Sequence, residues 1–143
     1  TGRVGYDAFG SLSSRTPANE HFPRERGEAM TAVGLSTRFE LEEARTRSAP
    51  ITEKSAGLLL RKLPVWDPAG LGVDMYYWYH GTRAMKGMGG EHWEAWRRAM
   101  LHAVVGSQAA DGSWEAVGPW GVHGGRVYAT VLMTLCLSAT GGE

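Results

Sequence analysis

The sequence contains a single cysteine, Cys136, which lies within an apolar run. One cysteine excludes an internal disulfide and a cysteine-based zinc cage, so we expect Cys136 to be a buried small hydrophobic residue. The chain also has no net charge, because its 15 basic residues are balanced by 15 acidic residues. It therefore lacks the electrostatic footprint of a protein that binds nucleic acid or an anionic membrane.

Long hydrophobic runs are missing as well. A membrane-spanning helix needs roughly eighteen or more consecutive apolar residues, and no such run or charged-then-apolar leader occurs. The compartment stays unknown, because the chain opens on Thr1 and is expected to be a fragment of a longer chain. At 143 residues with 43% apolar content, we expect one domain over 1–143.

The chain is rich in tryptophan and glycine, with six and twenty copies respectively. Residues 1–24 are rich in glycine, serine and proline without a helical period, which predicts an irregular N-terminal loop. Apolar periodicity and helix-ending signals then predict an all-α chain with five main helices. These helices are expected over residues 25–43, 52–63, 74–88, 91–108 and 126–139.

The five predicted helices alternate in character. Helices 74–88 and 126–139 carry almost no charge, whereas helix 91–108 is amphipathic and has an i,i+4 pair of Glu94 and Arg98. Helices without a polar face are normally buried, so the first, third and fifth helices are expected to form an inner layer, with the other two outside. Small residues recur about 48 positions apart along the three inner helices, at Gly34, Thr82 and Thr130. This spacing indicates stacked helical hairpins.

A distinctive string follows the fourth predicted helix and contains Gln108, Asp111, Gly112 and Trp114. The glutamine can hydrogen-bond backbone groups at the helix end, Gly112 allows a tight exit, and Trp114 can cover the end of the helix. We interpret the four residues as a structural clasp between hairpins. The alternative is an ordinary capped helix followed by a turn with a surface tryptophan.

The string resembles the QW motif of squalene and oxidosqualene cyclases. Residues 2–6 (GRVGY) resemble the exit of an earlier repeat, and residues 124–137 resemble an inner helix of that family. Residues 74–82 (DMYYWYHGT) resemble inner helices of large bacterial proteins with prenyltransferase-like repeats. The resemblance implies an α/α toroid of antiparallel hairpins, in which inner helices surround a cavity and their ends line its mouth.

The catalytic signatures of this family are missing from the chain. The D-x-D-D acid segment of the cyclases and the Cys-Gly-Glu-Gln string of the thioester domains are both absent. At the position of the zinc-binding histidine of the prenyltransferases, the resemblance places Tyr128. We therefore expect no bound metal, no cofactor and no complete catalytic centre.

Six residues are candidates for lining a ligand site at the inner face. They share a place on, or at the start of, the two uncharged inner helices: Asp74, Tyr76, Tyr79, His80, Arg126 and Tyr128. The aromatic members can form an apolar wall or belong to the core, and His80 can be a hydrogen-bonded core histidine. Asp74 and Arg126 can meet a polar ligand or pair with each other.

These observations predict a non-enzymatic repeat module that binds a partner protein or an apolar ligand through its inner face. The alternative is part of a terpenoid cyclase or prenyltransferase-like enzyme whose catalytic residues lie outside this sequence. An arc of two and a half hairpins leaves inner surface open, so we expect it to be covered by another part of a longer chain, a partner protein or a second copy. The exposed patch is expected to include some of a set of apolar residues: Met75, Tyr76, Trp78, Tyr79, Tyr128 and Leu132.

Overall fold

The computed structural model describes residues 1–41 and 49–141, which contain helices and no strand. The all-α class predicted from the sequence is therefore confirmed. After a short 3-10 helix at Arg24–Arg26, five α-helices follow in this order: α1 (Ala29–Leu41), α2 (Pro50–Leu60), α3 (Met75–Met88), α4 (Gly90–Val105) and α5 (Gly121–Gly141).

The first two helices differ from their predicted bounds for local reasons. Helix α1 begins four residues late because Arg24–Arg26 forms a 3-10 turn and Gly27 is extended. Its predicted end at 43 lies outside the described residues. Helix α2 begins at Pro50 because proline suits the first helical turn, where its missing N–H leaves no hydrogen bond unmade.

The last three helices show the effects of capping and of glycine. Helix α3 begins after Asp74, whose carboxylate accepts a hydrogen bond from the backbone N–H of Tyr77 at 3.0 Å. Helix α4 ends three residues before the predicted 108, at the residue that precedes Gly106. Helix α5 has an extra first turn from Gly121, which a non-helical Gly125, with φ 67°, separates from the rest; the long part then begins at 126, as predicted.

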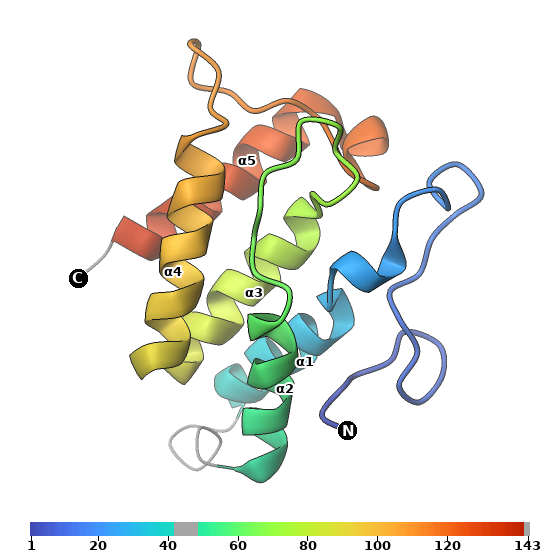
Figure 1. The fold of residues 1–143 in the computed structure, drawn as a ribbon, viewed down its shortest axis with the longest axis vertical. Coiled ribbons are helices and arrows are strands. Elements are labelled where there is room, and N and C mark those ends of the chain that lie inside the picture. Colours follow the sequence, from blue (N-terminus) through green and yellow to red (C-terminus); the bar gives the residue numbers. More distant parts are fainter. Residues whose placement is uncertain (42–48, 142–143) are drawn as a thin grey trace.

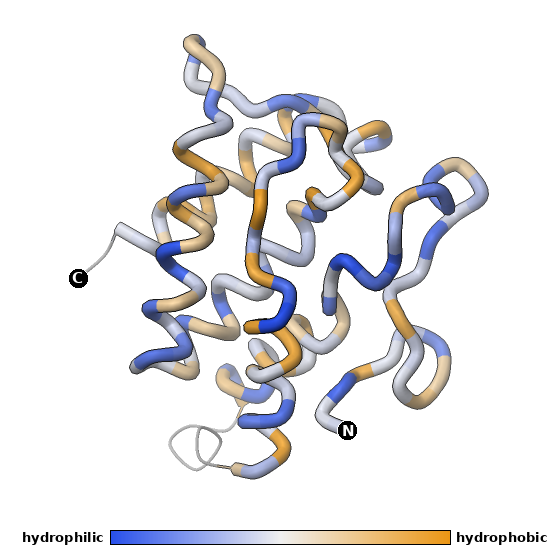
Figure 2. Tube along the Cα trace, in the orientation of Figure 1, coloured by the Kyte–Doolittle hydropathy of each residue, from blue (hydrophilic) through white to orange (hydrophobic). Residues whose placement is uncertain are grey.

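The helices form two layers, and α3 is the middle helix of the first layer (Figure 1). Helices α1 and α5 pack on either side of α3 without touching each other, which gives the order α1, α3, α5 in one layer. Helices α2 and α4 contact each other and cover this layer. Hydrophilic residues recur along α4, in agreement with its amphipathic sequence (Figure 2).

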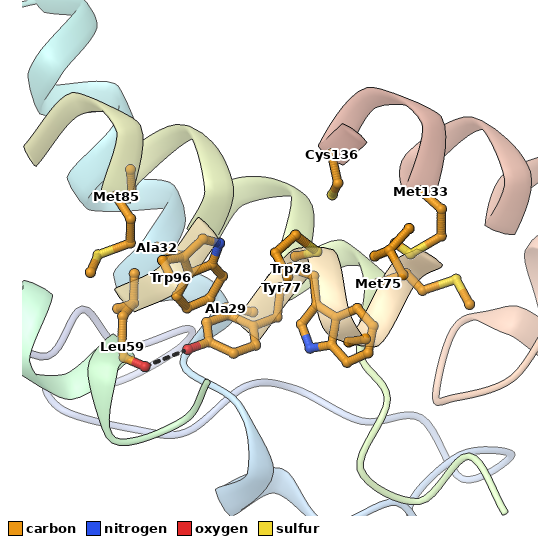
Figure 3. Close-up of a cluster of buried hydrophobic side chains, with 14 of the residues drawn as sticks. Ala29, Ala32, Leu59, Met75, Tyr77, Trp78, Met85, Trp96, Met133 and Cys136 are labelled. Atoms are coloured by element: carbon orange, nitrogen blue, oxygen red, sulfur yellow. Dashed lines mark hydrogen bonds between the residues drawn. The ribbon is translucent and has the colours of Figure 1, made fainter. Parts of the chain in front are cut away.

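The core is centred on aromatic residues between α3 and α4 (Figure 3). The rings of Tyr77 and Trp96 meet edge to face, with centroids 5.6 Å apart, and both side chains are fully buried. Gly81 makes this approach possible, because a Cβ atom there would lie 2.4 Å from the indole of Trp96. The single O–H of Tyr77 is shared between the backbone oxygens of Lys62 at 3.1 Å and Leu59 at 3.3 Å, at the C-terminal end of α2.

The repeat spacing of 48 residues is visible in two loops. Gly70 and Gly118, 48 positions apart, both have left-handed φ angles, of 76° and 83°. Each carbonyl accepts a backbone hydrogen bond from three residues ahead, from Val73 at 3.3 Å and from Gly121 at 3.2 Å. The loops also touch, since a Cβ on Gly118 would lie 1.9 Å from the Val73 oxygen. Two similar turns therefore lie 48 positions apart and contact each other, as expected if the hairpins are stacked.

The N-terminal segment is irregular, as predicted, but it is packed onto the helices (Figure 1). Arg3 pairs with the buried Glu28 at 2.6 Å, just before α1. The buried amide of Asn19 donates to the backbone oxygen of Pro119 at 2.8 Å, across 100 positions of sequence. Val4 covers Gly34 on the outer side of α1. Residues 1–24 are therefore a structural cap on one edge of the helical layers.

Candidate ligand pocket

A pocket of about 650 Å³ lies where the N-terminal segment meets the first turns of α1, α3 and α5. We call it the N-terminal pocket. The pocket has a helix-side wall and a segment-side wall, formed by Ala29, Met30, Tyr76, Trp120, His123, Gly124 and Tyr128 on the helix side and by Tyr6, Ser13, Ser14 and Thr16 on the segment side. Its volume falls within the range of small-molecule sites in proteins.

Helix geometry places the aromatic rings of the helix-side wall. Tyr76 is the second residue of α3, directly after Met75, and Asp74 is the N-cap of this helix. Tyr128 follows the break at Gly125, and its ring lies against Gly124, where a Cβ atom would be 2.5 Å from the Tyr128 Cγ. Glycine at position 124 is therefore required for the Tyr128 ring to lie in this place.

The pocket wall has few ionisable groups. Its described lining includes no aspartate, glutamate, lysine or arginine side chain, and its one basic side chain is that of His123. Two buried acids lie behind the wall at the starts of α1 and α3, and each faces an arginine from the N-terminal segment: Glu28 with Arg3 at 2.6 Å and Asp74 with Arg15 at 3.9 Å. Glu28 and Asp74 also compensate the positive ends of the helix dipoles of α1 and α3.

Burial sets the protonation of the groups near the pocket. The pKa of Asp74 is raised chiefly by burial, against the hydrogen bond from the Tyr77 N–H and the attraction of Arg15. Burial also raises the pKa of Tyr128, with smaller contributions from Asp74 and Tyr76. The Tyr128 phenol therefore stays protonated at neutral pH and can donate a hydrogen bond.

Ser13 is the buried hydroxyl of the segment-side wall. Its side chain is 9% exposed, and its Oγ finds no hydrogen-bond partner within residues 1–41 and 49–141. A buried hydroxyl without a partner is unfavourable, and such groups are rare in folded proteins.

The structure brings together only two of the six predicted lining residues, Tyr76 and Tyr128. Asp74 is buried behind the wall as the cap of α3. His80 lies between the rings of Tyr76 and Tyr79, with centroid distances of 4.6 and 4.9 Å, and neither His80 nor Tyr79 lines the pocket.

Asp74 and Arg126 do not pair with each other, contrary to one of the two roles predicted for them. Asp74 faces Arg15, which belongs to residues 1–24, the segment predicted only to be an irregular loop. Arg126 instead lies 3.1 Å from a carboxylate oxygen of Asp111, on the exposed turn before α5. The prediction failed because both contacts depend on loops whose paths carry no periodic signal.

The residues of the predicted clasp lie at the end of α4. The Gln108 Nε2 donates to the backbone oxygen of Gly112 at 2.8 Å and remains exposed. Trp114 is 1% exposed, and its indole N–H donates to the Val104 oxygen at 2.9 Å. The backbone N–H of Trp114 also donates to the Thr130 Oγ1 at 3.3 Å, so this residue links α4 to α5.

The exposed apolar surface matches the predicted patch only in part. Tyr76 is exposed, and Tyr79, Tyr128 and Leu132 are half-buried. Met75 and Trp78 are 2% and 1% exposed, because they face the neighbouring helices of α3. Helix α5, which was expected to be enclosed, has one open face. Three exposed apolar residues of its long part are spaced at i, i+4 and i+8, and we call them the α5 stripe: Val127, Val131 and Leu135.

Sequence reasoning missed the segment-side wall and the residues at the start of α5. Tyr6, Ser13 and Thr16 lie in an aperiodic stretch, Trp120 directly precedes α5, and His123 lies in its glycine-rich first turn. Their contacts join positions up to 100 residues apart, as between Asn19 and Pro119, and no local pattern encodes such a contact.

Across the described ranges, no three His, Cys, Asp or Glu side chains are grouped closely enough to hold a metal ion. Within the same residues, none of the helices has the length and apolar character needed to cross a membrane. Comparisons with protein-family models, with curated proteins and with solved structures find no match for this chain.

Proposed function

We propose that this chain is a non-enzymatic repeat module of the α/α-toroid type that binds an apolar small molecule in the N-terminal pocket. The observation that carries the proposal is the mostly apolar, aromatic-lined pocket of about 650 Å³ at the ends of the three helices of one layer. Small-molecule sites are typically concave and mostly apolar, with a few polar groups.

Two further observations support the toroid architecture. The order α1, α3, α5 in one layer, covered by α2 and α4, is the arrangement expected of stacked hairpins. The turns at Gly70 and Gly118 repeat at the same spacing of 48 positions as Thr82 and Thr130. The resemblance of the Gln108–Trp114 string to a QW motif points to the same family.

The competing proposal is a part of a terpenoid cyclase or prenyltransferase-like enzyme. It would need an acid segment or a metal ligand set that the present sequence lacks. A parent chain with a D-x-D-D segment, or with an aspartate, cysteine and histidine set, would favour this alternative over the binding module.

Titration with the uncharged dye N-phenyl-1-naphthylamine tests the binding proposal, because its fluorescence rises in apolar sites. We expect saturable binding by the wild type and strongly weakened binding by Tyr128→Ala, which removes one wall of the pocket. Tyr79→Ala is the matched control, since Tyr79 is a half-buried tyrosine outside the lining. Equal binding by all three proteins, with circular dichroism showing intact helices, would place the dye elsewhere and reject the proposed site.

A further inference from the structure

We propose that Asn19 is a positioning residue of the N-terminal pocket. Its buried side chain joins the segment-side wall to the chain just before α5 and thereby sets the size of ligand that the pocket prefers. Asn19 does not itself line the pocket, so it acts through the residues that do. The inference rests on the proposed function and adds the residue that determines size selectivity at that site.

The side chain of Asn19 is hydrogen-bonded on both sides of the pocket. Its Oδ1 accepts from the backbone N–H of Thr16 at 2.6 Å and from the Thr16 hydroxyl at 3.1 Å, and Thr16 belongs to the segment-side wall. Its Nδ2 donates to the backbone oxygen of Pro119 at 2.8 Å. Pro119 directly precedes Trp120, a residue of the helix-side wall. One amide group therefore connects the two walls.

The bond from Asn19 to Pro119 has no counterpart elsewhere in the described ranges. It is the only hydrogen bond there between residues 1–24 and residues 106–141. The other polar contacts of the segment are with α2 and the first residues of α1 and α3, such as the bond from Ser55 Oγ to the Gly2 oxygen at 2.7 Å. The polar attachment of the segment-side wall to the α5 side of the pocket therefore depends on Asn19.

Burial makes this attachment sensitive to the chemistry of residue 19. Asn19 is fully buried, so neither its amide nor the oxygen that it contacts can turn to water without local movement. An aspartate has nearly the same shape but no N–H, and it would place a second acceptor against the Pro119 oxygen. Loss of the donor should therefore move the two walls apart.

The corresponding position of the next loop shows that the turn itself does not need this amide. Asp67 lies 48 positions after Asn19, and the backbone oxygen of each accepts from the N–H three positions ahead, at 3.1 Å and 2.8 Å. The Asp67 carboxylate accepts from two backbone N–H groups of its own loop. Asn19 differs because its amide donates to a distant loop, and this donor is what the pocket uses.

Two uncharged dyes of different size test the inference in the intact chain. 1-Naphthylamine has one ring system, and N-phenyl-1-naphthylamine carries an additional phenyl ring. The variants are Asn19→Asp, which keeps an acceptor for Thr16 but has no donor for Pro119, and Asn19→Ala, which introduces no charge. Ser55→Ala is the matched control, because it also removes a buried hydrogen bond of the segment, at a place outside the lining.

The measured quantity is the dissociation constant of 1-naphthylamine divided by that of N-phenyl-1-naphthylamine. We expect this ratio to rise about three- to tenfold in both Asn19 variants, because the small dye loses contact with one wall while the larger dye still reaches both. Ser55→Ala should leave the ratio within about twofold of the wild type, since a smaller folded fraction weakens both dyes by the same factor. The ratio therefore distinguishes positioning from stability.

The wild type provides an independent measurement. Asn19 is the only asparagine of the chain and Gln108 the only glutamine, so a nitrogen-15 spectrum contains two pairs of signals from their side-chain amides. Gln108→Ala assigns them. We expect the Asn19 pair to exchange slowly with deuterated water and to shift when N-phenyl-1-naphthylamine is added. The exposed Gln108 pair should exchange fast and stay in place.

The outcomes separate this inference from the proposed function. If N-phenyl-1-naphthylamine binds in a Tyr128-dependent way but the ratio is unchanged in the Asn19 variants, Asn19 is not a positioning residue and the pocket stands. Binding that leaves the wild-type Asn19 signals in place overturns the inference equally, and this measurement decides if circular dichroism shows both Asn19 variants to be unfolded. If neither dye binds the wild type, the pocket is not a ligand site and both proposals fail.

Discussion

The buried indole N–H of Trp96 on α4 donates a hydrogen bond to the Oγ1 of Thr82 on α3 at 3.0 Å. Thr82 in turn donates to the backbone oxygen of Trp78 at 2.8 Å, one turn earlier in α3. Both side chains are almost completely buried. One threonine therefore satisfies the polar atom of a core tryptophan and joins the two layers of the fold.

Replacement of Thr82 by valine should destabilise the protein by about 1–3 kcal/mol, because the buried Trp96 N–H would lose its acceptor. Thr82→Ser keeps the hydroxyl and should cost clearly less. The free energy of unfolding from chemical denaturation measures both effects. A loss for Thr82→Val no larger than that for Thr82→Ser, which removes only the methyl group, would show that the hydrogen bond contributes no more to stability than the methyl packing does.

Trp114 and Gln108 should differ strongly in their contribution to stability. Trp114→Ala should cost roughly 3–5 kcal/mol, as expected for a fully buried aromatic residue whose N–H is also bonded. Gln108→Ala should cost less than about 1 kcal/mol, because the Gln108 side chain is exposed although it bonds Gly112. A Trp114→Ala loss below about 1 kcal/mol, measured by denaturation, would show that this residue does not hold α4 to α5.

Arg15 and Asp74 should show energetic coupling, because they are 3% and 7% exposed and face each other at 3.9 Å. Arg15→Met leaves a buried carboxylate without its cation, whereas Asp74→Asn keeps a side chain that can cap α3. We expect Arg15→Met to be less destabilising in the Asp74→Asn background, by on the order of 1 kcal/mol. A double-mutant cycle measures this difference. Additive losses would mean that the two side chains do not interact.

His80 should make the protein less stable in mild acid. Burial, followed by repulsion from Arg83, lowers the pKa of His80 below its ordinary value, against an attraction from Glu40. The unfolded chain, with a histidine pKa of about 6.5, then binds more protons than the folded chain, so stability falls as the pH drops below that value. The stability gap between wild type and His80→Gln should change between about pH 7.5 and 5.5, in favour of the variant at the lower pH. A constant gap would show that His80 keeps its ordinary pKa.

The α5 stripe should mediate self-association. Val127, Val131 and Leu135 are 77%, 50% and 43% exposed, and α5 carries no charged side chain from Val127 to Gly141. Two copies can therefore meet along this face without like-charge repulsion. Light scattering should show concentration-dependent association of the wild type and a monomer for Val131→Glu. A wild type that stays monomeric at high concentration would show that the stripe does not pair with itself.

Local sequence determined the helices, because periodicity and capping act over a few residues. Asp74 before an apolar run defined the start of α3, and Gly89 defined its end. The uncharged or charged character of each helix also indicated its layer. The bounds failed at Pro50 and at Gly106, whereas the long part of α5 begins directly after the break at Gly125, at the predicted residue 126.

The tertiary structure alone decided the pocket and the open face. Residues 1–24 have no period, yet their arginines and Asn19 meet groups far along the chain and place Ser13 opposite the helix ends. Composition predicted that helix 126–139 would be enclosed, but burial depends on how many neighbours surround a helix. Helix α3 contacts the other four α-helices and still exposes Tyr76, Arg83 and Lys86, whereas the described chain provides α5 with α3 and α4 only, and this leaves Val131 exposed.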